Sequence, residues 1–192
     1  MNRSLPGTDT VAAAIQGTPG ALDRLIDGSL PAVLGWCKRL LGPRGDPEDA
    51  AHDVLVVVID RIGELKDPIA FPSWLFQVTR RVMATHRRRA WVRRWMPGAS
   101  TDIVDLDPSP ERRYLADEVS RSVQDMLDQL PEAQRITLIL HDLEGRSDSE
   151  VADLLGIPKG TVKSRLRLGR ARLKTLAEAA GLMPAASQRR AL

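Results

Sequence analysis

Residues 145–176 read GRSDSEVADLLGIPKGTVKSRLRLGRARLKTL. Within them, Ser147 and Glu150 have the spacing of a capping box, which predicts that a short helix begins here. The run Gly156-Ile157-Pro158 predicts a tight turn, and a second, basic helix is expected to follow it. This layout is typical of a helix-turn-helix, whose second helix lies in the major groove of DNA. The stretch therefore indicates the class of partner, which is duplex DNA.

The second helix of this motif is expected to bury one face and to expose another. Five apolar residues would lock the two helices together: Val151, Leu155, Ile157, Val162 and Leu166. Four polar residues are left to face outward near its start: Lys163, Ser164, Arg165 and Arg167. Because such side chains hydrogen-bond to base edges and phosphates, these four are candidate DNA contacts. Arg170, Arg172 and Lys174 lie further along and stay open as phosphate contacts or solvated charges.

The composition of the chain favours small helical bundles. Aromatic residues make up only 4% of its 192 residues, so Leu, Val, Ile and Ala must build the core. β-Sandwiches rely on aromatic and β-branched pairs, and the composition points away from them. The single Cys37 excludes an intramolecular disulfide and fits a reducing compartment. No apolar run approaches the roughly 18 residues of a membrane span, and the N-terminus lacks a signal-peptide pattern. We therefore expect a cytoplasmic protein without membrane insertion.

Two basic blocks stand out against a net charge of only +3. Seven arginines and no acid lie between Arg80 and Arg94, and seven Lys or Arg and no acid lie between Lys159 and Lys174. Solvated helix faces usually mix the two signs, so we interpret both blocks as polyanion-binding faces. The charges of residues 102–118, between the blocks, are mostly acidic.

One segment reads at first as a buried strand, because residues 54–59 are all apolar. The acids around it argue for a helix, since all four fall within about 60° on a helical wheel. They are Asp49, Asp53, Asp60 and Glu64. Asp46 and Pro47 suit the N-terminus of such a helix, as a cap and as its first residue. We therefore predict a helix with one acidic stripe.

The whole chain is predicted to be all-α. Further helices are expected over residues 21–41, from Ser73 onward, over 111–130 and over 132–143. Three prolines, a glycine and three aspartates without periodicity predict a flexible acidic linker at 96–110. We thus expect two small helical domains, 11–95 and 111–180, with disordered tails over 1–10 and 181–192. The C-terminal domain carries the helix-turn-helix.

Several motifs resemble those of bacterial sigma factors of the extracytoplasmic-function (ECF) group. In the C-terminal half, LPEAQR (130–135), EGRS (144–147), EVA (150–152) and GTVKSRL (160–166) resemble region four. In the N-terminal half, PEDAAHDV (47–54) and WLFQVTR (74–80) resemble two motifs of region two. The resemblance covers about residues 20–178, in the expected order. Two regions together are more specific than a helix-turn-helix alone.

This resemblance implies a function and its protein partners. A sigma factor of this group binds core RNA polymerase, recognises the −35 and −10 promoter elements, promotes melting and initiates transcription. Its region two docks on the basic clamp helices of the polymerase β′ subunit, and its region four contacts the β flap. The matching docking residues are Asp49, His52, Asp53 and Asp60, for which a merely solubilising face is the alternative. The family also implies an anti-sigma partner, although no residue here identifies one.

The resemblance also assigns the DNA contacts. Region four reads the −35 element as a duplex, and its matching positions are Lys163, Ser164, Arg165 and Arg167. The −10 candidates are Lys66, Phe71, Arg80, Arg81, Arg87 and Arg88. The arginines would form a basic track for a single strand. Phe71 is equally consistent with stacking on a base and with a place in the core. In the linker, Asp102, Asp105 and Asp107 would mimic nucleic-acid charge or serve as a plain tether.

The chain departs from the family pattern at several positions. His52 and Leu55 replace the usual Gln and Phe of the docking motif. Arg81 and Thr85 replace an Asn and an Asp of the −10 motif, so the −10 base preference does not carry over. Leu168 stands where an Arg is common in the recognition helix. Pro158 replaces a Ser cap, which is tolerable if Pro158 is the first helical residue.

No motif of the sequence points to catalysis. His52, His86, His141 and Cys37 lack the spacing of metal ligands. Catalytic triads, paired carboxylates and Gly-rich phosphate loops do not stand out either, so we expect no enzyme activity and no cofactor. Two rival functions stay open. A conventional helix-turn-helix regulator would bind DNA without docking on polymerase and would not need the acidic helix at 48–64. An interaction protein whose motif has lost DNA binding would sequester a partner instead.

Overall fold

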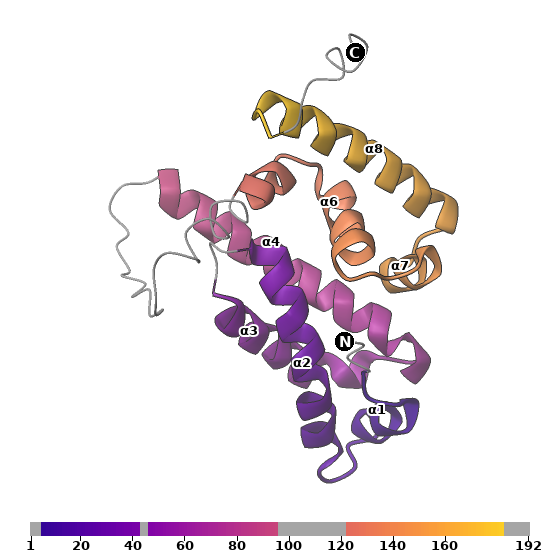
Figure 1. The fold of residues 1–192 in the computed structure, drawn as a ribbon. Coiled ribbons are helices and arrows are strands. Elements are labelled where there is room, and N and C mark those ends of the chain that lie inside the picture. Colours follow the sequence, from indigo (N-terminus) through magenta and orange to yellow (C-terminus); the bar gives the residue numbers. More distant parts are fainter. Residues whose placement is uncertain (1–4, 43–45, 96–121, 183–192) are drawn as a thin grey trace, which may run out of the picture. The chain divides into compact units, whose positions relative to one another are not determined.

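The structure, a computed structural model, describes residues 5–42, 46–95 and 122–182. Within these ranges every regular element is a helix, which confirms the predicted all-α class (Figure 1). The helices form two compact units. The first contains α1 to α4, and the second contains α6, α8 and most of α7. The predicted acidic linker at 96–110 lies outside the described residues.

The first unit is built from four helices and two short 3₁₀ turns. Their bounds are α1 (Thr8–Ile15), α2 (Ala21–Leu41), α3 (Pro47–Arg61), η2 (Ile62–Glu64), η3 (Pro68–Ala70) and α4 (Phe71–Trp95). Helices α2, α3 and α4 pack against one another, and α1 packs on α2 and on the two 3₁₀ turns. Because η2 and η3 connect α3 to α4, α1 also packs against that connection.

The N-terminus of α3 confirms the predicted cap. The backbone N–H groups of Glu48 and Asp49 donate to the side chain of Asp46 at 2.9 and 3.0 Å. Pro47 is the first helical residue, where its missing N–H costs nothing. The apolar run at 54–59 is helical, as the acidic stripe predicted.

Two boundaries of the first unit differ from the sequence prediction. Helix α1 begins at Thr8, inside the tail expected over 1–10, because Val11 and Ala14 are buried and anchor this short helix. Helix α4 begins at Phe71, two residues before the predicted Ser73. Phe71 is itself fully buried, and this burial draws the helix start into the core.

The core of the first unit is apolar with a small aromatic cluster. The rings of Trp36 and Phe76 meet edge to face, with centroids 5.0 Å apart and an interplanar angle of 88°. Cys37 of α2 is also part of the buried core. Burial raises the pKa of its thiol to about 12, so the side chain stays neutral.

The second unit is built from short helices and one long one. A helix over 122–128 is followed by α6 (Glu132–Leu138), the π-helical turn η4 (Ile139–Leu143), α7 (Asp148–Leu155) and α8 (Lys159–Ala179). The helix predicted over 132–143 is therefore α-helical only to Leu138, and its last turn is π-helical. Gly145 and Gly156, with φ of +70° and +65°, let the chain turn after η4 and after α7.

Helix α8 packs closely on α6 at a glycine. Gly169 is buried, and a Cβ atom placed there would lie 2.8 Å from Cδ1 of Leu138. The absence of a side chain thus lets the two helices approach. The crossing holds the opposite, polar face of α8 away from α6.

Candidate functional site

The polar residues proposed for DNA contact lie in the first half of α8, distributed around the part of its circumference that is not buried. Lys163, Ser164 and Arg167 are exposed and Arg165 is half-buried, whereas Val162, Leu166 and Gly169 on the other face are buried. Within the described residues, Lys163, Arg165 and Arg167 form no ion pair. Three cations that no ion pair neutralises suit a polyanionic partner.

The predicted cap and core of the helix-turn-helix are confirmed. The N–H of Ser147 donates to Glu150 Oε2 at 2.8 Å, and the N–H of Glu150 donates to Ser147 Oγ at 3.3 Å. The first of these bonds, with a further one from the Ser147 hydroxyl, lowers the pKa of the Glu150 carboxyl. The five apolar residues of the motif are buried, except Ile157, which is half-buried.

The turn differs from expectation at one residue. Pro158 stands at the N-cap of α8, with φ −61° and ψ 145°, and Lys159 is the first helical residue. The backbone carbonyl of Pro158 accepts the first intrahelical hydrogen bonds, from the N–H groups of Thr161 and Val162, but Pro158 offers no side chain to cap the helix. The start of α8 therefore keeps uncapped N–H groups beside its polar face.

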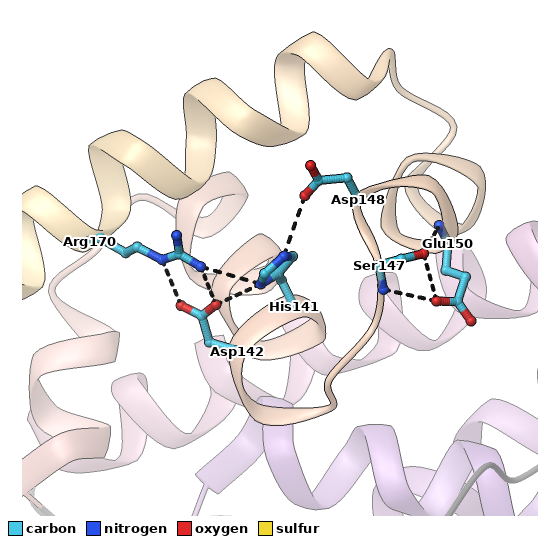
Figure 2. A network of polar contacts seen from close by, with 6 residues as sticks. All are labelled: His141, Asp142, Ser147, Asp148, Glu150 and Arg170. Carbon is cyan, nitrogen blue, oxygen red and sulfur yellow. Dashed lines mark hydrogen bonds and ion pairs between the residues drawn. The ribbon is translucent and has the colours of Figure 1, made fainter.

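Arg170 is held by an acid of the same unit. Its Nε donates to Asp142 Oδ2 at 3.0 Å and its Nη2 to Asp142 Oδ1 at 2.5 Å (Figure 2). These hydrogen bonds lower the pKa of the Asp142 carboxyl and raise that of Arg170. Neither role considered from the sequence, a phosphate contact or a solvated charge, included this pairing. Lys174 is also near an acid, with its Nζ 3.9 Å from Glu178.

The acidic stripe of α3 is exposed, but part of it is engaged by α4. His86 Nε2 lies 2.8 Å from Asp53, and His86 Nδ1 lies 3.9 Å from Asp49. The two aspartate side chains keep 46% and 67% of their surface exposed, so both stay accessible. His52 and Asp60 are exposed as well.

An apolar patch accompanies the stripe. Val56 and Ile59 are 51% and 50% exposed, at the spacing that places them on the His52 side of α3. Exposed apolar side chains that adjoin one another and are rimmed by polar residues are a feature of protein-binding surfaces, which makes this patch a candidate one. We call His52, Val56, Ile59 and the three aspartates Asp49, Asp53 and Asp60 the α3 surface.

Five of the six −10 candidates have side chains that are at least partly accessible, and the sixth is buried. Lys66, Arg81 and Arg88 are exposed, and Arg80 and Arg87 are half-buried. Arg87 also donates from Nη1 to the Leu40 carbonyl at 3.4 Å. Phe71 is fully buried, so the stacking role considered for it is wrong in this structure, and the core alternative holds.

A groove runs between α3 and α4 with a volume of about 390 Å³. Asp60, Arg61 and Glu64 line it from α3 and its end, and Trp74, Arg81 and Thr85 line it from α4. Trp74 is half-buried, so part of its indole stays accessible at this groove. The groove therefore combines an aromatic side chain with a basic one from α4.

Comparison with known proteins assigns both units. The family model for sigma-70 region 2 matches residues 25–93, and that for sigma-70 region 4 matches residues 120–173. The chain is 31% identical over 168 residues to the ECF RNA polymerase sigma factor SigM of Mycobacterium tuberculosis. That alignment covers 88% of this chain and 83% of SigM. The chain belongs to the ECF sigma factors.

Alignments with other sigma factors cover different shares of those proteins. The chain is 30% identical to the ECF RNA polymerase sigma factor SigE of Mycolicibacterium smegmatis, over 85% of this chain but only 64% of SigE. It is 27% identical to the RNA polymerase sigma-H factor of Pseudomonas aeruginosa, over 79% of this chain and 83% of that protein. The chain thus spans less than two thirds of SigE and most of sigma-H.

Two solved structures share the fold of this ECF chain. CnrH, in complex with the cytosolic domain of CnrY, gives a TM-score of 0.61 at 23% identity, covering 90% of this chain and 97% of CnrH. RpoE of Bartonella quintana, in complex with the anti-sigma factor NepR, gives a TM-score of 0.54 at 23% identity. That alignment covers 83% of this chain and 98% of RpoE.

Four residues of this sigma factor's surface were missed by sequence reasoning. Val56 and Ile59 read as core because the run 54–59 is uniformly apolar, and only the helical phase separates its exposed members. His86 and Asp142 pair with residues 33 and 28 positions away, for which one sequence carries no signal.

Among the described residues, no helix is long and apolar enough to cross a membrane. The described part also holds no cluster of three or more His, Cys, Asp or Glu suited to a metal ion.

Proposed function

We propose that this ECF sigma factor directs core RNA polymerase to promoters. It would bind one surface of the polymerase and recognise two promoter DNA elements. The observation that carries the proposal is the polar face of α8, where exposed cations without acidic partners lie opposite a buried apolar face. Arg and Lys on such a helix suit guanine edges and phosphates of the major groove. Lys163, Ser164, Arg165 and Arg167 are accordingly assigned to the −35 element.

The −10 element is assigned to α4 and the segment before it. Lys66 and the arginines Arg80, Arg81, Arg87 and Arg88 would follow the backbone of one strand. Trp74, at the groove beside Arg81, replaces Phe71 as the aromatic contact for a base. Melting then follows from binding, since stacking and pocket contacts offset an unstacking cost of a few kcal/mol per flipped base.

The α3 surface is assigned to polymerase docking. Its aspartates complement basic clamp helices of the β′ subunit, and Val56 and Ile59 would be covered there. Region four would contact the β flap. Since CnrH and RpoE are each solved with a bound protein, a regulatory partner of the anti-sigma type is proposed for this chain as well. All of these steps take place in the cytoplasm.

Reconstitution tests the proposal. Purified chain is mixed with core polymerase and genomic DNA fragments, and transcript starts are mapped, with core polymerase alone as the control. We expect starts that appear only with the chain and that share two upstream elements. A pull-down on core polymerase is run in parallel. Failure to bind core polymerase, with DNA binding retained, would instead establish a conventional helix-turn-helix regulator.

Promoter activity of an Arg165→Ala variant distinguishes the proposed sigma factor from the second rival, an interaction protein that does not bind DNA. A chain that has lost DNA binding and only sequesters a partner predicts unchanged activity for this variant. The proposal predicts reduced activity at promoters with a −35 element, because Arg165 lies on the reading face of α8.

A further inference from the structure

A polar network outside the proposed DNA contacts ties together three elements of the second unit. At its centre, the guanidinium of Arg170 from α8 donates two hydrogen bonds to the carboxylate of Asp142 from η4 (Figure 2). Such a bidentate pair fixes orientation as well as distance, because both groups are planar. The pair therefore defines how α8 lies against the π-helical turn.

His141 extends the network to the first helix of the helix-turn-helix. Its Nδ1 lies 2.7 Å from Asp142 Oδ1, and its Nε2 lies 3.4 Å from Oδ1 of Asp148. Asp148 is the first residue of α7, next to the capping box formed by Ser147 and Glu150. One chain of contacts thus runs from α8 through η4 to the start of α7, as Figure 2 shows.

The place of Arg170 on α8 allows two roles that oppose each other. On a helical wheel Arg170 falls within about 60° of Lys163 and Arg167, so the electrostatic field of DNA could reach it directly. The structure instead shows its guanidinium bound to an acid. If Arg170 were a phosphate contact, Asp142 would compete with DNA for it, and a positively charged face would carry a needless acid.

We propose that Asp142 and Arg170 are positioning residues for −35 recognition, which hold α8 in register with η4 and, through His141 and Asp148, with α7. The inference rests on the proposed function, because it concerns the same reading face. Arg170 acts through the helix it orients and not through a contact of its own with DNA. The rotation of α8 about its own axis is then set before DNA binds. The major groove is contacted from this fixed helix by Lys163, Ser164, Arg165 and Arg167.

The two roles make opposite predictions for the loss of the acid. Asp142→Asn removes a negative charge and frees Arg170, so a direct phosphate role predicts tighter DNA binding. The positioning role predicts weaker binding, because α8 loses its anchor. Arg170→Lys separates the roles again: lysine keeps the charge for a phosphate but cannot form the planar fork that matches a carboxylate.

The test uses holoenzyme reconstituted with core polymerase and a labelled duplex carrying the −35 element mapped for the wild type. Binding is measured by fluorescence anisotropy across a range of salt concentrations. We expect Asp142→Asn and Arg170→Lys each to weaken binding about fivefold, a change of about 1 kcal/mol. The double variant should be no weaker than either single one, since both remove the same contact. The salt dependence should stay that of the wild type.

Controls test whether a change of charge or a loss of folding explains a change in affinity. Asp153→Asn makes the same charge change as Asp142→Asn at an exposed acid of α7 that has no ion pair within the described residues. It should leave affinity within about twofold. Circular dichroism checks that each variant is folded at the assay temperature. Asp142→Glu, which keeps a carboxylate, should recover part of the lost affinity.

Three outcomes would overturn the inference. The first is an Asp142→Asn holoenzyme that binds as tightly as the wild type or more tightly. The second is an Arg170→Lys holoenzyme with wild-type affinity. The third is a fall in the salt slope of about one for Arg170→Gln, which is the signature of a lost phosphate contact. A wild-type holoenzyme that shows no −35 preference would overturn the proposed function, and this inference with it.

Discussion

Truncation of the apolar part of the α3 surface offers the most direct test of docking. The variant Val56→Ala/Ile59→Ala keeps every charge of the surface and removes only methyl and methylene groups. Full burial of a Val or Ile side chain contributes about 1.5–3 kcal/mol. Since the two residues are 51% and 50% exposed, docking can bury only about half of each. The pair is therefore worth about 2 kcal/mol, or about a 30-fold weaker Kd for core polymerase.

The assay is a titration of fluorescently labelled chain with core polymerase. The higher helix propensity of alanine offsets part of the packing lost from the buried halves of Val56 and Ile59, and circular dichroism checks that the variant is folded. Leu30→Ala is the matched control: Leu30 is 41% exposed but lies on α2. Leu30→Ala should bind like the wild type. If the double variant binds core polymerase within about threefold of the wild type, the docking assignment of this patch is wrong.

Three further outcomes follow from particular residues. Arg165→Ala should weaken binding of the −35 duplex by about 1–3 kcal/mol in a filter-binding assay, and an unchanged Kd would remove it from the reading face. Phe71→Ala should lower the free energy of unfolding in urea by about 3–5 kcal/mol, because the ring is fully buried; a loss below about 1 kcal/mol would contradict its core role. The Asp142 carboxyl has its pKa lowered below its ordinary 3.8, first by the Arg170 hydrogen bond. Its stabilising contribution is therefore complete above that ordinary value and is lost as the pH falls through the lowered one. Thermal melts of Asp142→Asn should accordingly fall less steeply with acid below about pH 4 than those of the wild type.

Local signals in the sequence predicted much of the fold. Asp46 before Pro47, and Ser147 three residues before Glu150, mark helix starts through bonds between near neighbours in the chain. Such bonds depend on spacing alone, so one sequence suffices to find them. The all-α class and the basic face of α8 follow from patterns of the same kind.

The remaining features depend on contacts between distant residues. Helix α1 is short and begins in a stretch with Gly and Pro, and it is stabilised by burial of Val11 and Ala14 rather than by its own propensity. The engagement of Asp53 by His86 joins α3 to α4 across 33 positions. Phe71 was ambiguous because an aromatic residue at a helix start suits both a core and a base, and only its packing decides between them.

The close approach of α8 to α6 at Gly169 has a consequence for how promoter preference can diverge. The residues that anchor the helix are Val162, Leu166, Gly169 and Arg170, and the residues proposed to read DNA occupy other positions. A substitution at the exposed reading positions Lys163, Ser164 and Arg167 therefore leaves the buried contacts of the helix intact. Base preference can drift in evolution, or be changed by design, at little cost in folding, whereas the anchor positions tolerate few replacements.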